Sequence, residues 1–288
     1  MKMPVMEGEG RVNNNLIQFN PQRISDISTV LSQKVTALAL LLKESKNSKS
    51  KQEIGKEIEK YLKLLLVEVC ECNVGIHFKR HLERIANSLL EAIQNLIKSS
   101  QNNQSEINQL TGVVWESCQQ LMSEKLPQSN EIFVGNYLDS IVEMLKDAVA
   151  EATQTQSGID FDGQVLEIST NDKEFISSCI ALVNTSILCL KKAKNVILKA
   201  SEDQKGSAGW IQDLDGLITT ANDLSAFTDD LICLLDIPLD IENPELQSSS
   251  LELSKSCKKV FDFIEKESLD IKWIDLCSEK LKSFRINE

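Results

Sequence analysis

Apolar residues recur along the chain at spacings of three and four residues, which is the repeat of an amphipathic α-helix. The first stripe contains Ile24, Ile27, Leu31, Val35, Leu38 and Leu42. Phe19, Asn20 and Pro21 come directly before it. Asn20 is a typical N-cap, Pro21 suits the first helical position, and Phe19 can form a hydrophobic staple with Ile24. The sequence therefore predicts a helix that starts at Pro21.

Further stripes of the same kind follow, so the pattern predicts about nine amphipathic helices in total. A lysine-rich break at 43–51 ends the first of them, and Gly75 marks a bend. The other helices are expected at 51–74, 76–99, 105–123, 130–153, 172–200, 208–236, 244–267 and 269–284. The spans 22–126 and 128–237 contain no proline, which favours long uninterrupted helices.

The longest interruption of the helical pattern lies at 154–171, where no apolar stripe occurs and two glycines are present. We place the main domain boundary there. The predicted fold class is all-α, with two antiparallel helix bundles whose apolar stripes bury one another. The expected organisation is a disordered tail at 1–18, an N-terminal bundle at 19–155, an acidic and polar linker at 156–171 and a C-terminal bundle at 172–288. Helices could pack across the boundary.

Composition supports this fold class. Of the 288 residues 42% are hydrophobic, but only 9 Phe, 3 Trp and 2 Tyr are aromatic, with 11 Gly and 5 Pro. Sheet-rich proteins need more turn residues and more aromatic or β-branched strand residues, so an all-β fold is excluded. The longest apolar run, Ala37–Leu42, is far too short for a bilayer, and the N-terminus lacks the apolar core of a signal peptide. We therefore expect no membrane contact.

The net charge of −12 is unevenly distributed. Residues 1–104 contain 15 Lys and Arg against 11 Asp and Glu, whereas residues 105–288 contain 16 against 32. The acidic part would repel phosphate, which argues against direct nucleic-acid binding. The lysines at 43–51 fit a solvated loop, with nuclear import or an acidic partner as the alternative.

The acids are densest at 201–245, where 11 of them face a single base, Lys205. Many alternate with apolar residues on the predicted 208–236 helix. This segment is either a solvated helix face or a docking surface for a basic partner. The candidate partner-binding residues are Asp213, Asp215, Asp223, Asp229 and Asp230.

Other residue patterns do not assemble into a catalytic, metal or cofactor site. The eight cysteines include no C-x-x-C pair, so we expect reduced and mostly buried thiols. His77 and His81 are four residues apart, but Lys79 and Arg80 lie between them where a metalloprotease motif needs a glutamate. We therefore expect no metal, no cofactor and no enzymatic activity.

One acidic fragment leaves a remote alternative open. Asp160 and Asp162 flank Phe161, as the two catalytic acids do in phosphohydrolases of the haloacid dehalogenase type. That chemistry needs the first aspartate at the end of a buried parallel strand. Residues 151–157 are polar and do not favour such a strand, so an acidic linker is the preferred interpretation.

Several segments resemble the cyclin-D-binding proteins, also called cyclin-D-interacting proteins. The central one is Thr111–Gln120 (TGVVWESCQQ), followed by Leu126–Asn130 (LPQSN) and Leu145–Ala148 (LKDA). Further similar stretches are Cys179–Val183 with Ser186 and Cys189–Lys192, Leu214–Ile218 through Ile232, and Trp273-Ile274. The similarity extends from about residue 25 to 284, and the first 100 residues match mainly in their helix pattern.

The resemblance implies a non-enzymatic, all-helical interaction protein of cytoplasm and nucleus. Its relatives bind D-type cyclins and signalling adaptors and are described as negative regulators of the cell cycle, which reduce cyclin-dependent phosphorylation of the retinoblastoma protein. They are also described as helix-loop-helix proteins without a basic region that sequester helix-loop-helix partners. A cytoskeletal or membrane-adjacent adaptor built from vinculin- or talin-like bundles is the alternative within the binding class.

Overall fold

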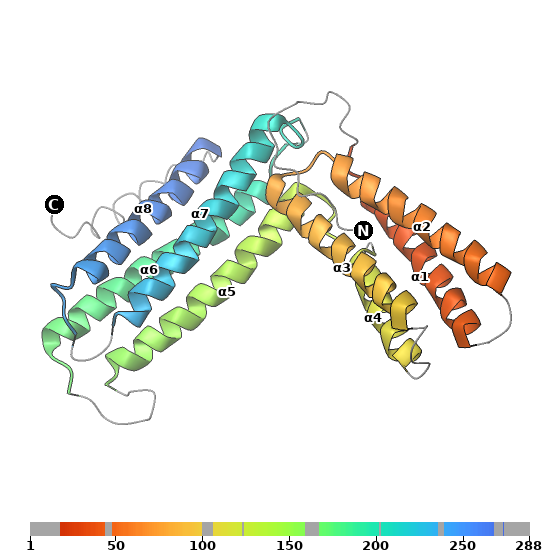
Figure 1. Cartoon of the computed structure of the whole chain (residues 1–288). Helices are drawn as coiled ribbons and strands as arrows, with labels where there is room; N and C mark the ends of the chain where they lie inside the picture. Colours follow the sequence, from red (N-terminus) through yellow and green to blue (C-terminus); the bar gives the residue numbers. More distant parts are fainter. Residues whose placement is uncertain are drawn as a thin grey trace. The chain divides into compact units, whose positions relative to one another are not determined.

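The computed structural model describes residues 18–43, 48–99, 106–122, 124–158, 167–201, 203–235, 239–267 and 273 (Figure 1). These residues contain eight α-helices and no strand, which confirms the all-α fold class. The helices are α1 (Pro21–Lys43), α2 (Ser48–Glu71), α3 (Ile76–Ser99), α4 (Ile107–Gln120), α5 (Asn130–Gln156), α6 (Thr170–Leu198), α7 (Ala208–Cys233) and α8 (Pro244–Glu267).

The helix boundaries follow the apolar stripes closely. α3 and α8 have the predicted bounds, and α1, α5 and α7 start where the sequence places their starts. α2 begins at Ser48 instead of residue 51, so part of the lysine-rich segment is helical, and α4 is shorter than 105–123. The expected tail lies outside the described residues apart from Gln18, and the expected 269–284 helix lies outside them apart from Trp273.

The chain forms two compact units, and their division differs from the boundary expected at 156–171. The first unit consists of 1–74 and 79–128, and the second consists of 75–78 and 129–288. The difference concerns α5, which contacts α6 and α7. Its buried residues include Leu138, Ile141 and Leu145. Because α5 needs these partners to cover its apolar stripe, it belongs to the second bundle and not to the first.

In the first unit, α1 packs against both α2 and α4. Ile24, Leu31 and Val35 of α1 are buried, as their spacing predicts. The side-chain oxygen of Asn20 accepts a hydrogen bond from the backbone N–H of Arg23, at 3.1 Å, which confirms the predicted N-cap. The Arg23 guanidinium also pairs with Glu68 of α2 at 2.9 Å, and the Glu68 side chain is only 4% exposed.

The described residues of the second unit contain a bundle of four long helices. α5 contacts α6 and α7, and α8 contacts the same two helices, so the four form a ring in the order α5, α6, α8, α7. Helices that are consecutive in the sequence run in opposite directions, so α5 is parallel to α7 and α6 is parallel to α8 (Figure 1). Ser129, Ser169 and Ser207 cap α5, α6 and α7, since each hydroxyl accepts a hydrogen bond from a backbone N–H in the first helical turn.

α6 contains a long, predominantly apolar stretch. Among the described residues, it is the one helix that is long and apolar enough to cross a membrane by length and composition. Eleven of its residues are buried, and it packs between α5 and α8. Core helices of soluble bundles have this same composition.

Candidate partner-binding surface

The five candidate aspartates all lie on α7, outside its buried stripe. That stripe includes Trp210, Leu214 and Leu217 in the first half of the helix and Leu224 and Leu231 in the second. The structure separates the aspartates into two groups, because two of them bind other described residues and three have no such partner.

Asp215 caps another helix. Its carboxylate accepts hydrogen bonds from the backbone N–H groups of Ile76, at 2.8 Å, and His77, at 3.2 Å. These groups belong to the first turn of α3, which the contacts assign to the second unit. A carboxylate there satisfies unpaired N–H groups and complements the positive end of the helix dipole. Asp215 therefore stabilises the start of α3.

Gly75 leaves room for this cap. A Cβ atom at this position would lie 2.7 Å from Oδ1 of Asp215, closer than real Cβ contacts allow. The backbone N–H of Gly75 also donates a hydrogen bond to the side-chain oxygen of Asn130, at 2.8 Å. The glycine that the sequence marks as a bend thus permits close approach of the carboxylate to the α3 terminus.

Asp213 also has a partner within the second unit. Its carboxylate forms an ion pair with Lys266 of α8. The hydrogen bond from Lys266 to Asp213 raises the pKa of the ammonium group, and the nearby charge of Glu267 acts in the same direction. The Lys266 side chain is 59% exposed, so solvent screens the pair and its contribution to stability is small.

Asp223, Asp229 and Asp230 form the free part of the acidic surface. Asp223 is half-buried, whereas Asp229 and Asp230 are exposed. None of the three has a hydrogen bond or ion pair within the described part of the chain. Their carboxylates can therefore accept contacts from a partner without breaking an internal one.

The neighbouring helix α5 extends this surface. The Tyr137 hydroxyl donates a hydrogen bond to Asn222 of α7. Two turns further along α5 and one turn further along α7, the Ser225 hydroxyl lies 4.0 Å from the sulfur of Met144. Met144 is 50% exposed although it is apolar. The edge between α5 and α7 thus presents a flexible apolar side chain one turn before Asp229 of α7.

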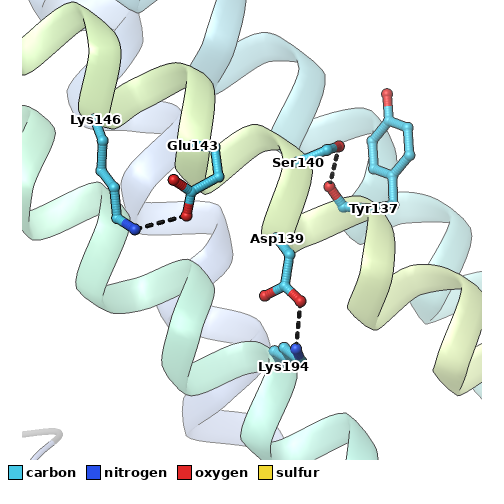
Figure 2. Close-up of polar contacts among 6 residues, drawn as sticks. All are labelled: Tyr137, Asp139, Ser140, Glu143, Lys146 and Lys194. Atoms are coloured by element: carbon cyan, nitrogen blue, oxygen red, sulfur yellow. Dashed lines mark hydrogen bonds and ion pairs between the residues drawn. The ribbon is translucent and has the colours of Figure 1, made fainter.

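The acids of α5 are partly paired, as Figure 2 shows. Asp139 forms an ion pair with Lys194 of α6, and Glu143 forms one with Lys146 at 2.6 Å. Asp147, the next acid along, is exposed and has no ion pair with a described residue. The sequence analysis missed Met144 and Asp147. The spacing of Asp139, Glu143, Asp147 and Glu151 at four-residue intervals is the signal that could have indicated this second acidic stripe.

A buried polar contact holds the first turn of α7 against the first turn of α5. The indole N–H of Trp210 donates to the carboxylate of Glu131 at 2.9 Å. Both residues are buried, with 3% and 4% exposure. Glu131 lies in the first turn of α5, where the helix dipole favours its negative charge.

The described residues contain no cluster of three or more His, Cys, Asp or Glu that could hold a metal ion.

The two histidines, His77 and His81, do not form a pair. His77 contacts Thr219 at 3.3 Å, while His81 contacts Arg84 at 3.2 Å, so the two rings have different partners. Burial lowers the pKa of His81, and the charge of Arg84 lowers it further. Asp160 and Asp162 lie outside the described residues.

Most of the cysteines are core residues, as expected from their positions on the apolar stripes. Five of the seven described cysteines are buried, Cys70 is half-buried and Cys233 is exposed. Burial raises the pKa of Cys72 to about 11 and the pKa values of Cys118 and Cys179 to about 12. These three thiols are therefore protonated at neutral pH and are poor nucleophiles.

Comparison with known proteins finds a family match. Residues 23–158, from α1 through the end of α5 and just under half of the chain, match the family described as "Grap2 and cyclin-D-interacting, N-terminal". Over these residues the chain is similar to the cyclin-D-interacting protein family. The match includes the segment Thr111–Gln120, on α4, which carries the main resemblance in the sequence.

Two curated relatives agree with this match. The chain is 29% identical to "Cyclin-D1-binding protein 1 homolog" of Xenopus laevis over 168 residues, which are 52% of the chain and 48% of the frog protein. It is 24% identical to "Cyclin-D1-binding protein 1" of Bos taurus over 237 residues, which are 69% of the chain and 63% of the bovine protein. The matched regions thus span between half and two thirds of these relatives. No solved structure matches the chain.

Proposed function

We propose that this chain is a non-enzymatic interaction protein that binds a D-type cyclin. The observation that carries the proposal is the family match, together with two relatives that are named for binding cyclin D1. An eight-helix architecture without a metal-binding cluster among its described residues is consistent with a binding role. In this proposal the chain negatively regulates the cell cycle by sequestering its partner, which is a cyclin, a signalling adaptor or a helix-loop-helix protein.

The proposed docking surface is the acidic outer face of α7 together with its edge toward α5. Asp223, Asp229 and Asp230 supply carboxylates that have no partner among the described residues, and Asp147 adds another from α5. Met144 supplies an exposed apolar contact, and methionine adapts well to different partner surfaces. We therefore expect a basic surface on the partner, with electrostatic attraction that speeds association and weakens at high salt.

A binding measurement with purified proteins tests both the function and the surface. The full chain is immobilised, and a purified D-type cyclin is passed over it at low and high salt. We expect saturable binding, and the double substitution Asp229→Lys with Asp230→Lys should weaken it at least tenfold, mainly through slower association.

The matched control is Glu53→Lys with Glu71→Lys on α2. These residues are also exposed, and the change in net charge is the same. Equal loss in both variants would contradict the docking surface and would indicate a bulk charge effect. Absence of binding by the wild-type chain would contradict the proposed function itself.

The proposal places the protein in cytoplasm and nucleus, where cell-cycle regulators act. Fluorescence microscopy of the tagged chain in its own cells tests this localisation. Exclusion of the protein from both compartments would contradict it.

A further inference from the structure

Two cysteines meet in the core of the second unit. Cys189 of α6 and Cys257 of α8 are both fully buried, and their sulfur atoms are 3.9 Å apart. The two helices are neighbours in the four-helix ring, and the cysteines are 68 positions apart in the sequence. Sequence periodicity placed each cysteine on an apolar stripe, but only the packing of α6 on α8 brings the two thiols together.

The pair differs chemically from the isolated buried thiols. Cys118 and Cys179 are buried, and burial raises the pKa of each to about 12. For Cys257, the hydrogen bond with Cys189 lowers the pKa, burial opposes this, and a hydrogen bond with Ser186 lowers it further. Cys257 therefore forms a thiolate more readily than Cys118 and Cys179 do.

We propose that Cys189 and Cys257 form a reversible redox modification site, at which a peroxide or a small disulfide oxidant converts the two thiols into a disulfide between α6 and α8. A disulfide has a sulfur–sulfur distance of about 2.0 Å, so the sulfur atoms must approach by about 2 Å from their present contact. Rotation of the two cysteine side chains would have to supply this movement. The inference is independent of the cyclin-binding proposal, since it concerns the core of the bundle.

With hydrogen peroxide the reaction is balanced as follows. The Cys257 thiolate attacks one peroxide oxygen, the O–O bond breaks, and the leaving hydroxide takes a proton to become water, which leaves Cys257 as a sulfenic acid. The Cys189 sulfur then attacks the Cys257 sulfur. The S–O bond breaks, and the sulfenic hydroxyl leaves as a second water with the proton of Cys189. One peroxide is reduced for each disulfide formed, and dithiothreitol reverses the modification by thiol–disulfide exchange.

The disulfide would close a loop that contains the end of α6, the whole of α7 and the first half of α8. A covalent closure of this length restricts the unfolded chain much more than the folded bundle. The oxidised protein should therefore unfold at a higher temperature than the reduced protein. The redox state of the two cysteines would thereby change the temperature at which the second unit unfolds.

Peptide mapping of the full-length protein tests the site. The reduced protein is treated with hydrogen peroxide, excess oxidant is removed, free thiols are alkylated and the protein is digested without reductant. We expect a peptide that links Cys189 to Cys257, with the mass loss of about 2 Da that disulfide formation causes. Cys118 and Cys179 should be alkylated as free thiols. Dithiothreitol should remove the linkage and restore the lower unfolding temperature.

Single substitutions separate the two roles. In Cys189→Ser, Cys257 should stop at the sulfenic acid, which dimedone traps, whereas Cys257→Ser should leave Cys189 unmodified. Cys118→Ser is the matched control, since it removes a buried thiol without affecting the pair. Circular dichroism establishes that each variant is helical before oxidation. The proposal is overturned if the linked peptide is absent at a dose that oxidises exposed Cys233, or if it forms only after denaturation.

Discussion

An aspartate on a helix surface can bind a partner or complete the fold, and α7 contains both kinds. Asp215 accepts hydrogen bonds from two backbone N–H groups at the start of α3. In contrast, Asp229 and Asp230 are exposed and have no partner among the described residues. A pattern of acids alternating with apolar residues does not distinguish these roles, because the groups that Asp215 binds are almost 140 positions away in the sequence. The charge of a residue is therefore a poor guide to its availability for binding.

This difference predicts unequal costs of substitution at the residue scale. Asp215→Ala removes a side-chain cap from α3, and such a loss costs about 1 kcal/mol of unfolding free energy. The matched substitution Asp229→Ala removes an unpaired surface carboxylate and should change stability by less than about 0.5 kcal/mol. Urea unfolding followed by circular dichroism measures both values. Equal destabilisation by the two variants would contradict the capping role of Asp215.

At the scale of the element, α5 is placed by contacts in its first turn and along its apolar stripe. Ser129 caps its first turn, and Glu131 in that turn accepts a hydrogen bond from the indole N–H of Trp210. Leu138, Ile141 and Leu145 then fill the core beside α6 and α7. A helix of this kind depends on its neighbours, since burial of its stripe contributes more than its intrinsic propensity. The Glu131–Trp210 hydrogen bond fixes how α5 and α7 are aligned.

Removal of the Glu131 carboxylate should therefore loosen the pairing of α5 with α7. Glu131→Ala leaves the buried indole N–H without an acceptor, which costs about 1–3 kcal/mol. Glu131→Gln keeps an oxygen acceptor and should cost less. Equilibrium unfolding gives the two free energies, and the fluorescence of Trp210 reports on its surroundings. A glutamine variant as unstable as the alanine variant would show that the charge, and not the hydrogen bond, is the important contribution.

At the scale of the whole molecule, the division into units decides which helices stabilise one another. The second unit contains a complete ring of α5, α6, α8 and α7. Each of these helices covers part of the apolar stripe of two others. A fragment that omitted α5 would expose the faces of α6 and α7 that it covers, so exposed apolar surface would replace a packed core.

Two fragments test this division. Residues 129–288 should give a helical fragment with one cooperative unfolding transition, because the four helices of the ring are all present. Residues 172–288, which start at the boundary expected from the sequence, lack α5 and should be aggregated or only loosely structured. Circular dichroism during thermal unfolding and size-exclusion chromatography compare them. Cooperative unfolding of the shorter fragment at the same temperature would contradict the contact-based division.

Local patterns determined the elements of this protein. Stripes at three- and four-residue spacing gave the helices, and Asn20 marks a start that the structure confirms. These features depend on residues within one turn of each other, so a single sequence contains them completely. The segment around Trp115 likewise indicated the family, and residues 23–158 match it.

Only the tertiary structure decided which helices share a core and which acids remain free. The interruption at 154–171 looked like a domain boundary, yet α5 and α6 on either side of it pack together. The contacts of Asp215 with the start of α3, Glu131 with Trp210, and Cys189 with Cys257 join residues 68 to 139 positions apart. Helix periodicity specifies which face of a helix is buried but not which helix covers it, because every amphipathic stripe offers similar apolar surface. The choice among the stripes is made by packing in the folded chain.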